Sequence, residues 1–420
     1  MSVVVVGQGY VGLPLALEAC VAGLTVVGLD SDPGVVNSIN AGTSHVDDIS
    51  DEDLCWAAAR GYRATTDPSV LSTAEIVVVC VPTPLSSQGA PDLSHVISAG
   101  RMLGRWITPG TLCILESTTY PGTTEEVFAP LITCDRLSVG HDVFIAFSPE
   151  RIDPGNDSFG LKNTPKVVGG MTPACLERAT VFYEKMVERV VVVPGPREAE
   201  MAKLIENTFR FVNIALVNEM VRFCDELDID IWEALRAAAT KPFGYMPFWP
   251  GPGVGGHCIP VDPSYLSHRV KTKLGYPFRL VETAAEVNYA APYYITTRVS
   301  QLLNRTGLAV HGSTVLLLGV TYKADIADVR ESPAIQVAAT LLEWGADVRY
   351  HDPYIEQWRL PGADAPLRSV EDPYAAARDA AVVVLLQNHA SYQPAQLTRA
   401  ATAILDTRGV LPTEPHVERL

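Results

Sequence analysis

SVVVVGQGYVGLPLAL, residues 2–17, is the stretch that decides the fold. Its run of four valines predicts a buried β-strand, and the apolar residues after Gly12 recur at helical spacing. Between strand and helix, glycines stand at positions 7, 9 and 12, the spacing of a turn that binds a dinucleotide. The stretch therefore predicts the first strand–turn–helix unit of a doubly wound α/β domain.

Each glycine of this turn has a separate task. Gly7 permits the tight turn, Gly9 lets the backbone approach a pyrophosphate, and Gly12 lets the helix pack closely on the strand. The amino end of the helix then faces the phosphates. Tyr10 and Val11 belong to the same turn, so we expect both to contact the cofactor.

A carboxylate follows at the position where a dinucleotide site needs one. The second expected strand, residues 24–30, ends at Asp30, and a carboxylate there can accept hydrogen bonds from an adenosine ribose. Residues 31–33 contain no arginine for a 2′-phosphate, so NAD is favoured over NADP. The alternative is a strand–turn–helix unit of the same kind that binds no ligand.

Further apolar runs alternate with amphipathic segments along the first half of the chain. Continuous apolar strands separated by helices predict a parallel sheet covered on both faces. The expected strands are residues 2–6, 24–30, 75–81, 111–116, 142–147, 165–170 and 189–194. Thr83 follows the third of these and Thr118 the fourth, at the edge where open parallel sheets bind ligands, although either could be an ordinary turn residue.

The middle of the chain has a different pattern. Residues 198–235 place apolar side chains at helical spacing over a length greater than a typical globular helix, which predicts a long spine helix between domains. Residues 241–263 are rich in Pro, Gly and aromatic side chains and predict a shaped loop. A helical region, 264–306, precedes a second alternating set of strands at 314–320, 346–353, 379–387 and 402–407.

The predicted fold class is thus α/β, with two Rossmann-like doubly wound domains joined by a helical central region. We expect an NAD-binding domain at 1–196, a central helical domain with the cysteine-bearing loop at 197–300, and a second Rossmann-like domain at 301–420. A chain of 420 residues has the length for two or three domains of this kind.

Composition excludes several classes of protein. With 47% apolar residues the chain is not disordered, and its net charge of −16 argues against a partner that is nucleic acid or an anionic membrane. The eight cysteines form no C-x-x-C pair and no zinc-type cluster, so no metal site is expected. The first residues lack the pattern of a signal peptide and no apolar run is long enough to span a membrane, so we expect a cytoplasmic protein.

Cys258 is the cysteine whose surroundings suggest chemistry. It stands in GGHCIPVD, residues 255–262, where glycines give access, His257 is adjacent and Asp262 follows four residues later. A partly exposed thiol near cations is the setting in which a thiolate becomes available. A cysteine that only packs in the loop is the alternative from local context.

Seven motifs resemble the UDP-glucose/GDP-mannose 6-dehydrogenase family over nearly the whole chain. They are GQGYVGLPLA (7–16), CVPTP (80–84), ESTTYPGTTEE (116–126), SPERIDPG (148–155), AEMAKLIENTFR (199–210), PGPGVGGHCIPVDP (250–263) and GVTYKADIADVRESPA (319–334). The resemblance implies four-electron oxidation of the 6-hydroxymethyl group of a nucleotide-diphosphosugar to a carboxylate, with two equivalents of NAD.

The resemblance also implies roles for individual residues. Cys258 matches the nucleophile that traps the aldehyde, and Lys203 and Asn207 match the residues that stabilise the developing oxyanion and contact the sugar. Thr118, Glu150 and Asp262 match positions associated with the water that hydrolyses the thioester, and either carboxylate can serve as the base. The remaining substrate contacts implied by the motifs are Glu150, Arg151, Arg210, Gly255, His257 and Lys323.

Arg330 matches a residue near the NAD end of the cleft in the same family. Its alternative is a surface bridge to Asp328 or Glu331, a kind of pair that is common and weak. The family commonly dimerises through the long central helix, so the resemblance implies a homodimer. The apolar spacing of 199–235 is consistent with a buried helix pair, although the same stripe could be internal core.

HCIPVDP, YPGTTEE and SPERIDPG look more like the N-acetylhexosamine branch than the glucose branch, which makes UDP-N-acetylglucosamine the expected substrate. UDP- or TDP-glucose is the alternative. A two-electron hydroxyacid-type dehydrogenase, or a nucleotide-binding module without activity, is more distant, because neither needs the cysteine and the second α/β domain together.

Overall fold

The computed structural model describes residues 1–420 except 47–48, 87–88, 154–155, 157, 257 and 364. The chain divides into two compact units, Met1–Glu206 with Ser264–Tyr276, and Asn207–Pro263 with Pro277–Leu420. The divisions fall inside α7 (Pro196–Glu226) and near the start of α9 (Asp262–Leu274), whereas the sequence placed domain boundaries at 196 and 300.

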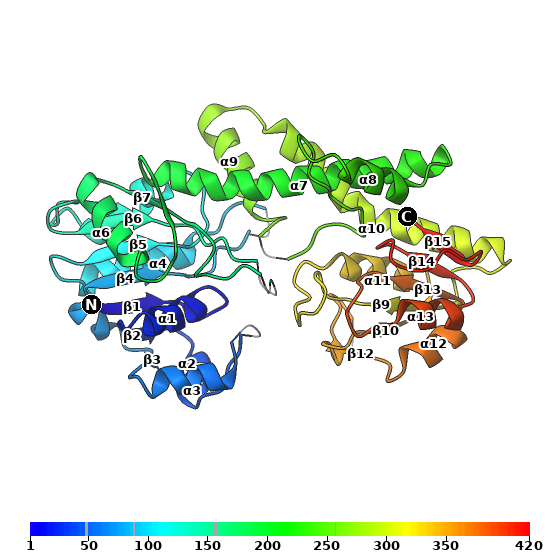
Figure 1. Ribbon diagram of the computed structural model, residues 1–420, viewed down its shortest axis with the longest axis horizontal. Helices are drawn as coiled ribbons and strands as arrows, with labels where there is room; N and C mark the ends of the chain where they lie inside the picture. The colour runs from blue at the N-terminus through cyan, green and yellow to red at the C-terminus, as the bar shows by residue number, and fades with distance from the viewer. Residues whose placement is uncertain (47–48, 87–88, 154–155, 157, 257, 364) are drawn as a thin grey trace. The chain divides into compact units, whose positions relative to one another are not determined.

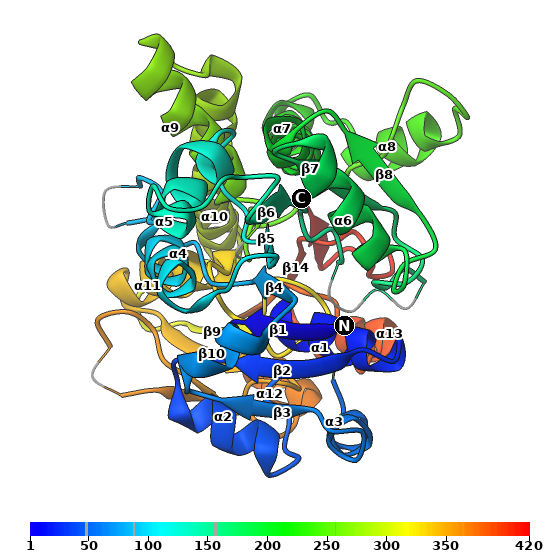
Figure 2. The ribbon, with the colours of Figure 1, turned by 90° about the vertical axis from the view of Figure 1, so that its left-hand side faces the viewer.

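The first unit is built on an eight-stranded sheet in the order β3-β2-β1-β4-β5-β6-β7-β8 (Figure 2). Its strands are β1 (Ser2–Val6), β2 (Thr25–Leu29), β3 (Arg63–Thr65), β4 (Ile76–Val79), β5 (Leu112–Leu115), β6 (Phe144–Phe147), β7 (Lys166–Gly170) and β8 (Val190–Val193). The helices are α1 (Gly12–Val21), α2 (Pro33–Asn40), α3 (Asp51–Ala58), α4 (Ser94–Trp106), α5 (Ala129–Thr133) and α6 (Pro173–Tyr183). A 3₁₀ turn, η1 (Pro68–Thr73), and a π turn, η2 (Thr124–Phe128), complete the unit.

Apolar clusters lie on both faces of this sheet, as continuous valine-rich strands require. The doubly wound prediction is confirmed, but the expectation of a wholly parallel sheet is wrong at one place. Strand β7 runs antiparallel to β6, with Ala146 opposite Gly170, and the described residues between these strands include no helix that could make a parallel crossover. The three-residue strand β3 was not predicted either, since RAT carries no apolar run.

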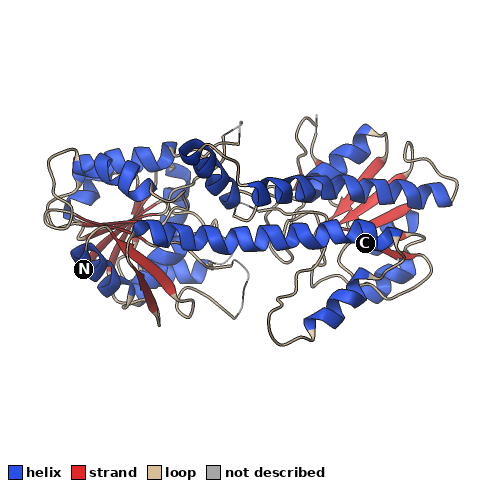
Figure 3. Ribbon diagram, turned by 90° about the horizontal axis from the view of Figure 1, so that it is seen from above, coloured by secondary structure: helices blue, strands red, loops and turns tan. Residues whose placement is uncertain are grey.

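The second unit contains a five-stranded parallel sheet in the order β10-β9-β13-β14-β15. Its strands are β9 (Thr314–Leu318), β10 (Asp347–His351), β13 (Val382–Leu385), β14 (Ile404–Asp406) and β15 (Val417–Arg419), with a small hairpin of β11 (Gln357–Trp358) and β12 (Leu367–Arg368). The helices are α8 (Ile231–Ala239), α10 (Arg279–Arg305), α11 (Pro333–Glu343), α12 (Pro373–Asp379) and α13 (Pro394–Ala400). Figure 3 shows the strands of each unit lying among helices.

The predicted spine helix is real but shorter than 198–235. Helix α7 runs for 31 residues and appears as one continuous helix in Figures 1 and 3. It ends at Glu226, Asp228 adopts a left-handed φ of 56°, and the side chain of Asp230 then caps α8 by accepting from the N–H of Trp232 at 2.9 Å. An Asp at a left-handed position and an Asp N-cap together divide the apolar pattern into two helices.

No helix among the described residues is long and apolar enough to cross a membrane.

Candidate functional site

The glycine turn after β1 has the geometry of a dinucleotide site. Gly7 has a φ of +86°, and a Cβ added there would lie 2.5 Å from the carbonyl oxygen of Cys80. A Cβ on Gly12 would lie 1.8 Å from the carbonyl oxygen of Gly7. A Cβ on Gly9, by contrast, would meet no atom within 4 Å, so open space lies in front of this one glycine. The turn therefore has room exactly where a pyrophosphate would approach the backbone.

The end of β2 completes this turn. Asp30 accepts the N–H of Gln8 at 2.7 Å on one carboxylate oxygen and the N–H of Asp32 at 2.9 Å on the other. Both hydrogen bonds fix the carboxylate while leaving lone pairs for the two hydroxyls of a ribose. Val11, the N-cap residue of α1, makes no side-chain cap, and the N–H of Leu13 donates to the carbonyl oxygen of Gly9 at 3.1 Å. These residues fit NAD.

The other predicted cofactor residues lie around the carboxyl edge of the same sheet. Tyr10 is exposed, Thr118 is half-buried and Thr83 is buried. The carbonyl oxygen of Thr83 accepts the hydroxyl of Tyr265 on α9 at 2.7 Å, which attaches α9 to the loop after β4. The contacts of these residues with NAD stay predictions.

Glu150 belongs to a buried charge cluster that the sequence analysis did not find. Lys166, the first residue of β7, donates to Glu150 Oε2 at 2.9 Å and to Glu116 Oε2 at 3.1 Å. The hydroxyl of Tyr183, at the end of α6, donates to the other oxygen of Glu116. Burial raises the pKa of the Glu150 carboxyl, but the charge and hydrogen bond of Lys166, the N–H of Ile152 and the charge of Lys203 together hold the pKa below its usual range.

A second buried carboxylate connects α7 to the loop that follows β5. Glu200 accepts the N–H of Gly122 at 2.6 Å, and the N–H and hydroxyl of Thr124 at 2.9 and 2.7 Å. Burial raises the pKa of this carboxyl to about 7. The bonds fix the loop that carries Thr118 against the helix that carries Lys203. Sequence reasoning missed Glu200 because, on a helix, it resembled any solvated charge.

Lys203 and Asn207 lie on one face of α7, and both are buried. The charge of Lys203 also lowers the pKa of Glu150, which belongs to the same unit. Arg151 pairs with Glu206 on this helix at 2.7 Å, and Arg210, one turn beyond Asn207, is exposed. Three predicted residues of the first unit are thus connected through the amino-terminal part of α7: Glu150, Arg151 and Lys203.

The cysteine loop ends in a helical turn. The N–H of Asp262 donates to the carbonyl oxygen of Cys258 at 2.9 Å, so Cys258 lies one turn before the start of α9, and it is exposed. Asp262 is buried and accepts the side-chain amide of Asn207 at 2.5 Å. A thiol at the amino end of a helix favours its thiolate form. His257 lies outside the described residues.

Close backbone packing explains the glycines of this loop. A Cβ on Gly255 would lie 2.6 Å from Cβ of Tyr322, and a Cβ on Gly256, whose φ is +84°, would lie 2.7 Å from the ring of Tyr322. The N–H of Gly256 donates to the carbonyl oxygen of Arg330 at 3.0 Å. The cysteine loop therefore packs directly on the loop after β9, which carries Lys323 and Arg330.

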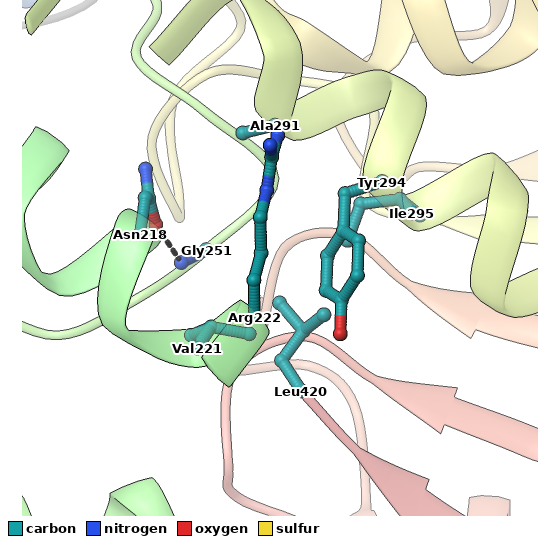
Figure 4. Close-up of a pocket in the computed structure, with 8 residues that line it drawn as sticks. All are labelled: Asn218, Val221, Arg222, Gly251, Ala291, Tyr294, Ile295 and Leu420. Carbon is teal, nitrogen blue, oxygen red and sulfur yellow. Dashed lines mark hydrogen bonds between the residues drawn. The ribbon is translucent and has the colours of Figure 1, made fainter. Parts of the chain in front are cut away.

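The amino-terminal part of the loop is anchored to α7. Asn218 accepts the N–H of Gly251 at 3.0 Å beside a cavity of about 10 Å³ that lies between α7, α10 and Leu420 (Figure 4). That volume is roughly the space of one water. The cavity is part of the loop's anchor and is too small for a nucleotide or sugar.

Arginines at the second sheet are placed in two different ways. Arg330 is exposed, and its guanidinium pairs with Asp328 at 2.7 Å, the bridge that the sequence offered as its alternative. Arg408, after β14, donates to the carbonyl oxygen of Leu386 at 2.7 Å, and burial lowers its pKa to about 10. A Cβ on Gly251 would lie 2.9 Å from this guanidinium. The sequence analysis missed Arg408, although an arginine directly after an expected strand was a usable signal.

The structure divides the predicted catalytic residues between its units. Thr118, Glu150 and Lys203 belong to the first unit, and Asn207, Cys258 and Asp262 belong to the second, together with Lys323 and Arg330. Within the described part of the chain, no group of three or more His, Cys, Asp or Glu side chains could hold a metal ion.

Comparison with known proteins identifies three domains of one family along the chain. Three models of the UDP-glucose/GDP-mannose dehydrogenase family match the chain, the NAD-binding domain at residues 1–187, the central domain at 197–290 and the UDP-binding domain at 316–413.

Among similar proteins is the NDP-N-acetyl-D-galactosaminuronic acid dehydrogenase of Ralstonia nicotianae, 37% identical over 97% of this chain and 96% of its own length. The UDP-N-acetyl-D-mannosamine dehydrogenase of Escherichia coli is 34% identical over 93% of this chain and 94% of its own. The solved structure of the UDP-ManNAc dehydrogenase from Pyrococcus horikoshii is similar with a TM-score of 0.90 and 30% identity, covering 100% of this chain and 99% of that one. The chain therefore belongs to the UDP-glucose/GDP-mannose dehydrogenase family and is an NAD-dependent nucleotide-sugar dehydrogenase.

Proposed function

We propose that the protein oxidises the 6-hydroxymethyl group of a UDP-linked N-acetylhexosamine to a carboxylate in two successive steps on one enzyme. The observation that carries the proposal is the position of Cys258, exposed one helical turn before Asp262, whose buried carboxylate holds Asn207. A nucleophile is needed here because oxidation at one carbon passes through an aldehyde that could otherwise escape.

The proposed reaction consists of two oxidations and one hydrolysis. In each oxidation the substrate carbon loses one hydride, which NAD would accept when bound, and the alcohol proton is released to solvent. The Cys258 thiolate adds to the aldehyde carbon, and the resulting thiohemiacetal loses the second hydride to become a thioester. Water then replaces sulfur at the carbonyl carbon and returns the thiol.

Charges of this chain fit the oxygen that carries the negative charge in these steps. Lys203 offers a buried ammonium and Asn207 an amide on the same helix face, the two donors that a developing oxyanion requires. Glu150, held as a carboxylate, is the group suited to take a proton from the hydrolytic water. Asp262 holds Asn207 and is the alternative base.

Binding of the nucleotide diphosphate falls to the second unit in this proposal. Lys323 lies in the loop after β9, and Arg408 lies at the end of β14, both at the carboxyl edge where open α/β sheets bind ligands. The glycine loop at 250–256 packs between them, touching Tyr322 and Arg408. Arg330 is assigned to the NAD side, after exchange of its partner Asp328.

The identity of the sugar is the most specific part of the proposal. The relatives named above are called dehydrogenases of UDP-N-acetyl-D-mannosamine or of NDP-N-acetyl-D-galactosaminuronic acid, which supports an N-acetylhexosamine. UDP-N-acetylglucosamine stays our prediction within that class. Turnover of the gluco, manno and galacto isomers, with UDP- and TDP-glucose, identifies the substrate, and a marked preference for a glucose nucleotide contradicts the class.

Helix α7 also supports a homodimer. Its large exposed apolar residues, Ile205, Phe209, Leu216 and Phe223, recur at intervals of four and seven. This spacing forms one stripe along the helix, the pattern of a helix that packs on a second copy. Light scattering is expected to give twice the mass of one chain, and to give a monomer for the double variant Leu216→Glu, Phe223→Glu.

Replacement of the nucleophile tests the mechanism. In Cys258→Ala we expect NAD to bind with unchanged affinity while uronate formation falls by at least about 10³-fold, since no covalent acceptor remains. Cys224→Ala, which changes a buried cysteine of α7, is the matched control and should keep normal turnover. Uronate formation by Cys258→Ala at the normal rate removes the thiol from the mechanism.

A further inference from the structure

The cluster of Glu116, Lys166 and Tyr183 beside Glu150 has no assigned part in the reaction. Lys166 is 3% exposed and Glu116 is 1% exposed, and these two ionisable side chains are paired with each other. Such a pair costs desolvation, and replacing it by apolar side chains is often neutral or stabilising. A buried ion cluster whose third charged member is the candidate base of the reaction therefore calls for a functional explanation.

We propose that Lys166 is a positioning residue that keeps Glu150 ionised and aimed for thioester hydrolysis, and that Glu116 and Tyr183 hold Lys166 in place. This inference rests on the proposed role of Glu150. It assigns no contact with substrate to Lys166, Glu116 or Tyr183.

The hydrogen bonds of Glu150 fix the orientation of its carboxylate. Oε1 accepts two backbone N–H groups, of Arg151 and Ile152, both at 2.7 Å, and Oε2 accepts Lys166 at 2.9 Å. Both oxygens are thus held by donors from the same unit. A carboxylate with three donors loses little freedom when it takes a water as a fourth partner.

The charges around Lys166 explain its own state. The ammonium lies between the carboxylates of Glu116 and Glu150, and these raise its pKa although burial opposes them. Burial raises the pKa of Glu116, while Lys166 and the hydroxyl of Tyr183 lower it. The charged groups that face Glu150 are therefore Lys166 from β7, Lys203 from α7 and Glu116 from the end of β5.

Two substitutions should move the pH dependence of hydrolysis in opposite directions. In Lys166→Met, Glu150 loses its hydrogen-bonded cation and keeps Lys203 and Glu116 as charged neighbours, so its pKa rises and the acid limb of the kcat profile moves up by roughly 1–3 pH units. In Glu116→Gln, Lys166 keeps Glu150 as its single carboxylate partner, so the pKa of Glu150 falls and the acid limb moves down. A residue that only fills space would lower kcat in both variants without opposite shifts.

The experiment measures kcat against pH for the full protein, with accumulation of acylated Cys258 followed by mass spectrometry. Lys166→Arg should restore most of the normal acid limb, and Lys185→Met, an exposed lysine just after α6, is the matched control that should leave the profile unchanged. If Lys166→Met does not fold, Glu116→Gln tests the same positioning role, because it leaves Glu150 as the carboxylate partner of Lys166.

Glu150→Gln separates the two levels of the proposal. It should stall as the acylated enzyme after a single turnover, with no acid limb left. Normal turnover in Glu150→Gln overturns its proposed role as base and the inference with it. A stalled Glu150→Gln, together with an unshifted acid limb in folded Lys166→Met, overturns the role of Lys166 alone. If Lys166→Met does not fold, a shift of the acid limb to higher pH in Glu116→Gln overturns the role of Lys166.

Discussion

The two parallel sheets begin with the same device and use it differently. Gly7 follows β1 and Gly319 follows β9, both with positive φ, and their N–H groups donate to the carbonyl oxygens of Leu29 and His351 at 2.8 and 2.9 Å. A Cβ on either glycine would lie 2.5 Å from the carbonyl oxygen of a neighbouring strand's end. The turn after the first strand therefore has the same backbone geometry in both sheets.

The acid at the end of the second strand marks the difference. Asp30 is half-buried and accepts the N–H groups of Gln8 and Asp32, whereas Asp352 is buried. Asp352 accepts the N–H of Val320 at 2.7 Å and Nε2 of His389 at 3.0 Å. Since Nδ1 of His389 accepts the N–H of Asp325, its ring proton lies on Nε2 and points at Asp352.

The loops that follow differ accordingly. From Gly7 the chain reaches α1 at Gly12, but from Gly319 it reaches α11 only at Pro333. In the first unit the acid holds the short turn before α1, and in the second the acid at the same position supports a longer loop that carries Lys323. The same strand–turn arrangement thus precedes a short glycine turn in the NAD-binding unit and a longer loop in the other.

The largest expected effect comes from removing Asp352. In Asp352→Ala, the N–H of Val320 and the ring of His389 lose their acceptor in the core, which should lower the free energy of unfolding by roughly 2–5 kcal/mol. Urea denaturation measures the loss. Asp347→Ala, which breaks the exposed pair with Arg349, should cost less than about 1 kcal/mol. Equal losses in the two variants would show that the buried acid does not support the second unit.

Substitutions of two glycines in one turn should affect stability and NAD binding separately. Gly7→Ala forces a positive φ and a clash with the Cys80 carbonyl, so we expect a loss of roughly 1–3 kcal/mol in stability. Gly9→Ala meets open space, so stability should hold while the affinity for NAD falls about tenfold or more. Calorimetric NAD titration with a melting curve checks both. Normal NAD binding by Gly9→Ala would mean that no pyrophosphate lies against this glycine.

Asp30 should give the smallest change of the three. In Asp30→Asn we expect NAD affinity to fall about tenfold, because a charge-assisted hydrogen bond to the ribose becomes a neutral one. Affinity for the nucleotide sugar should not change. Asp32→Asn, an exposed cap of α2 two residues away, is the control. A loss of equal size in Asp32→Asn would mean that general negative charge, and not the ribose contact, is responsible.

Much of the fold was predictable because its signals are local. Valine runs, glycine spacing and Asp30 define β1, the turn and β2 within thirty residues. Short strands such as β3 and β15 owe their existence to pairing with a neighbour, and their sequences carry no run of their own. The antiparallel direction of β7 also depends on its pairing with β6, and the local sequence pattern carries no information about that pairing.

The site was predictable only where a motif names the residue. Cys258 and Lys203 stood in recognisable motifs, but Lys166 is the first residue of a strand and Tyr183 the last of a helix. They meet Glu116 across separations of 50 and 67 residues. Periodicity predicts which face of a helix or strand is buried, but it does not predict which buried charged side chains will pair.

The most direct test of the mechanism is the yield of NADH per nucleotide sugar consumed, measured with the UDP-N-acetylhexosamine that the protein turns over. The account predicts two equivalents of NADH and one of uronate, with no free aldehyde. One equivalent of NADH, with an aldehyde or ketone as the product, would contradict it.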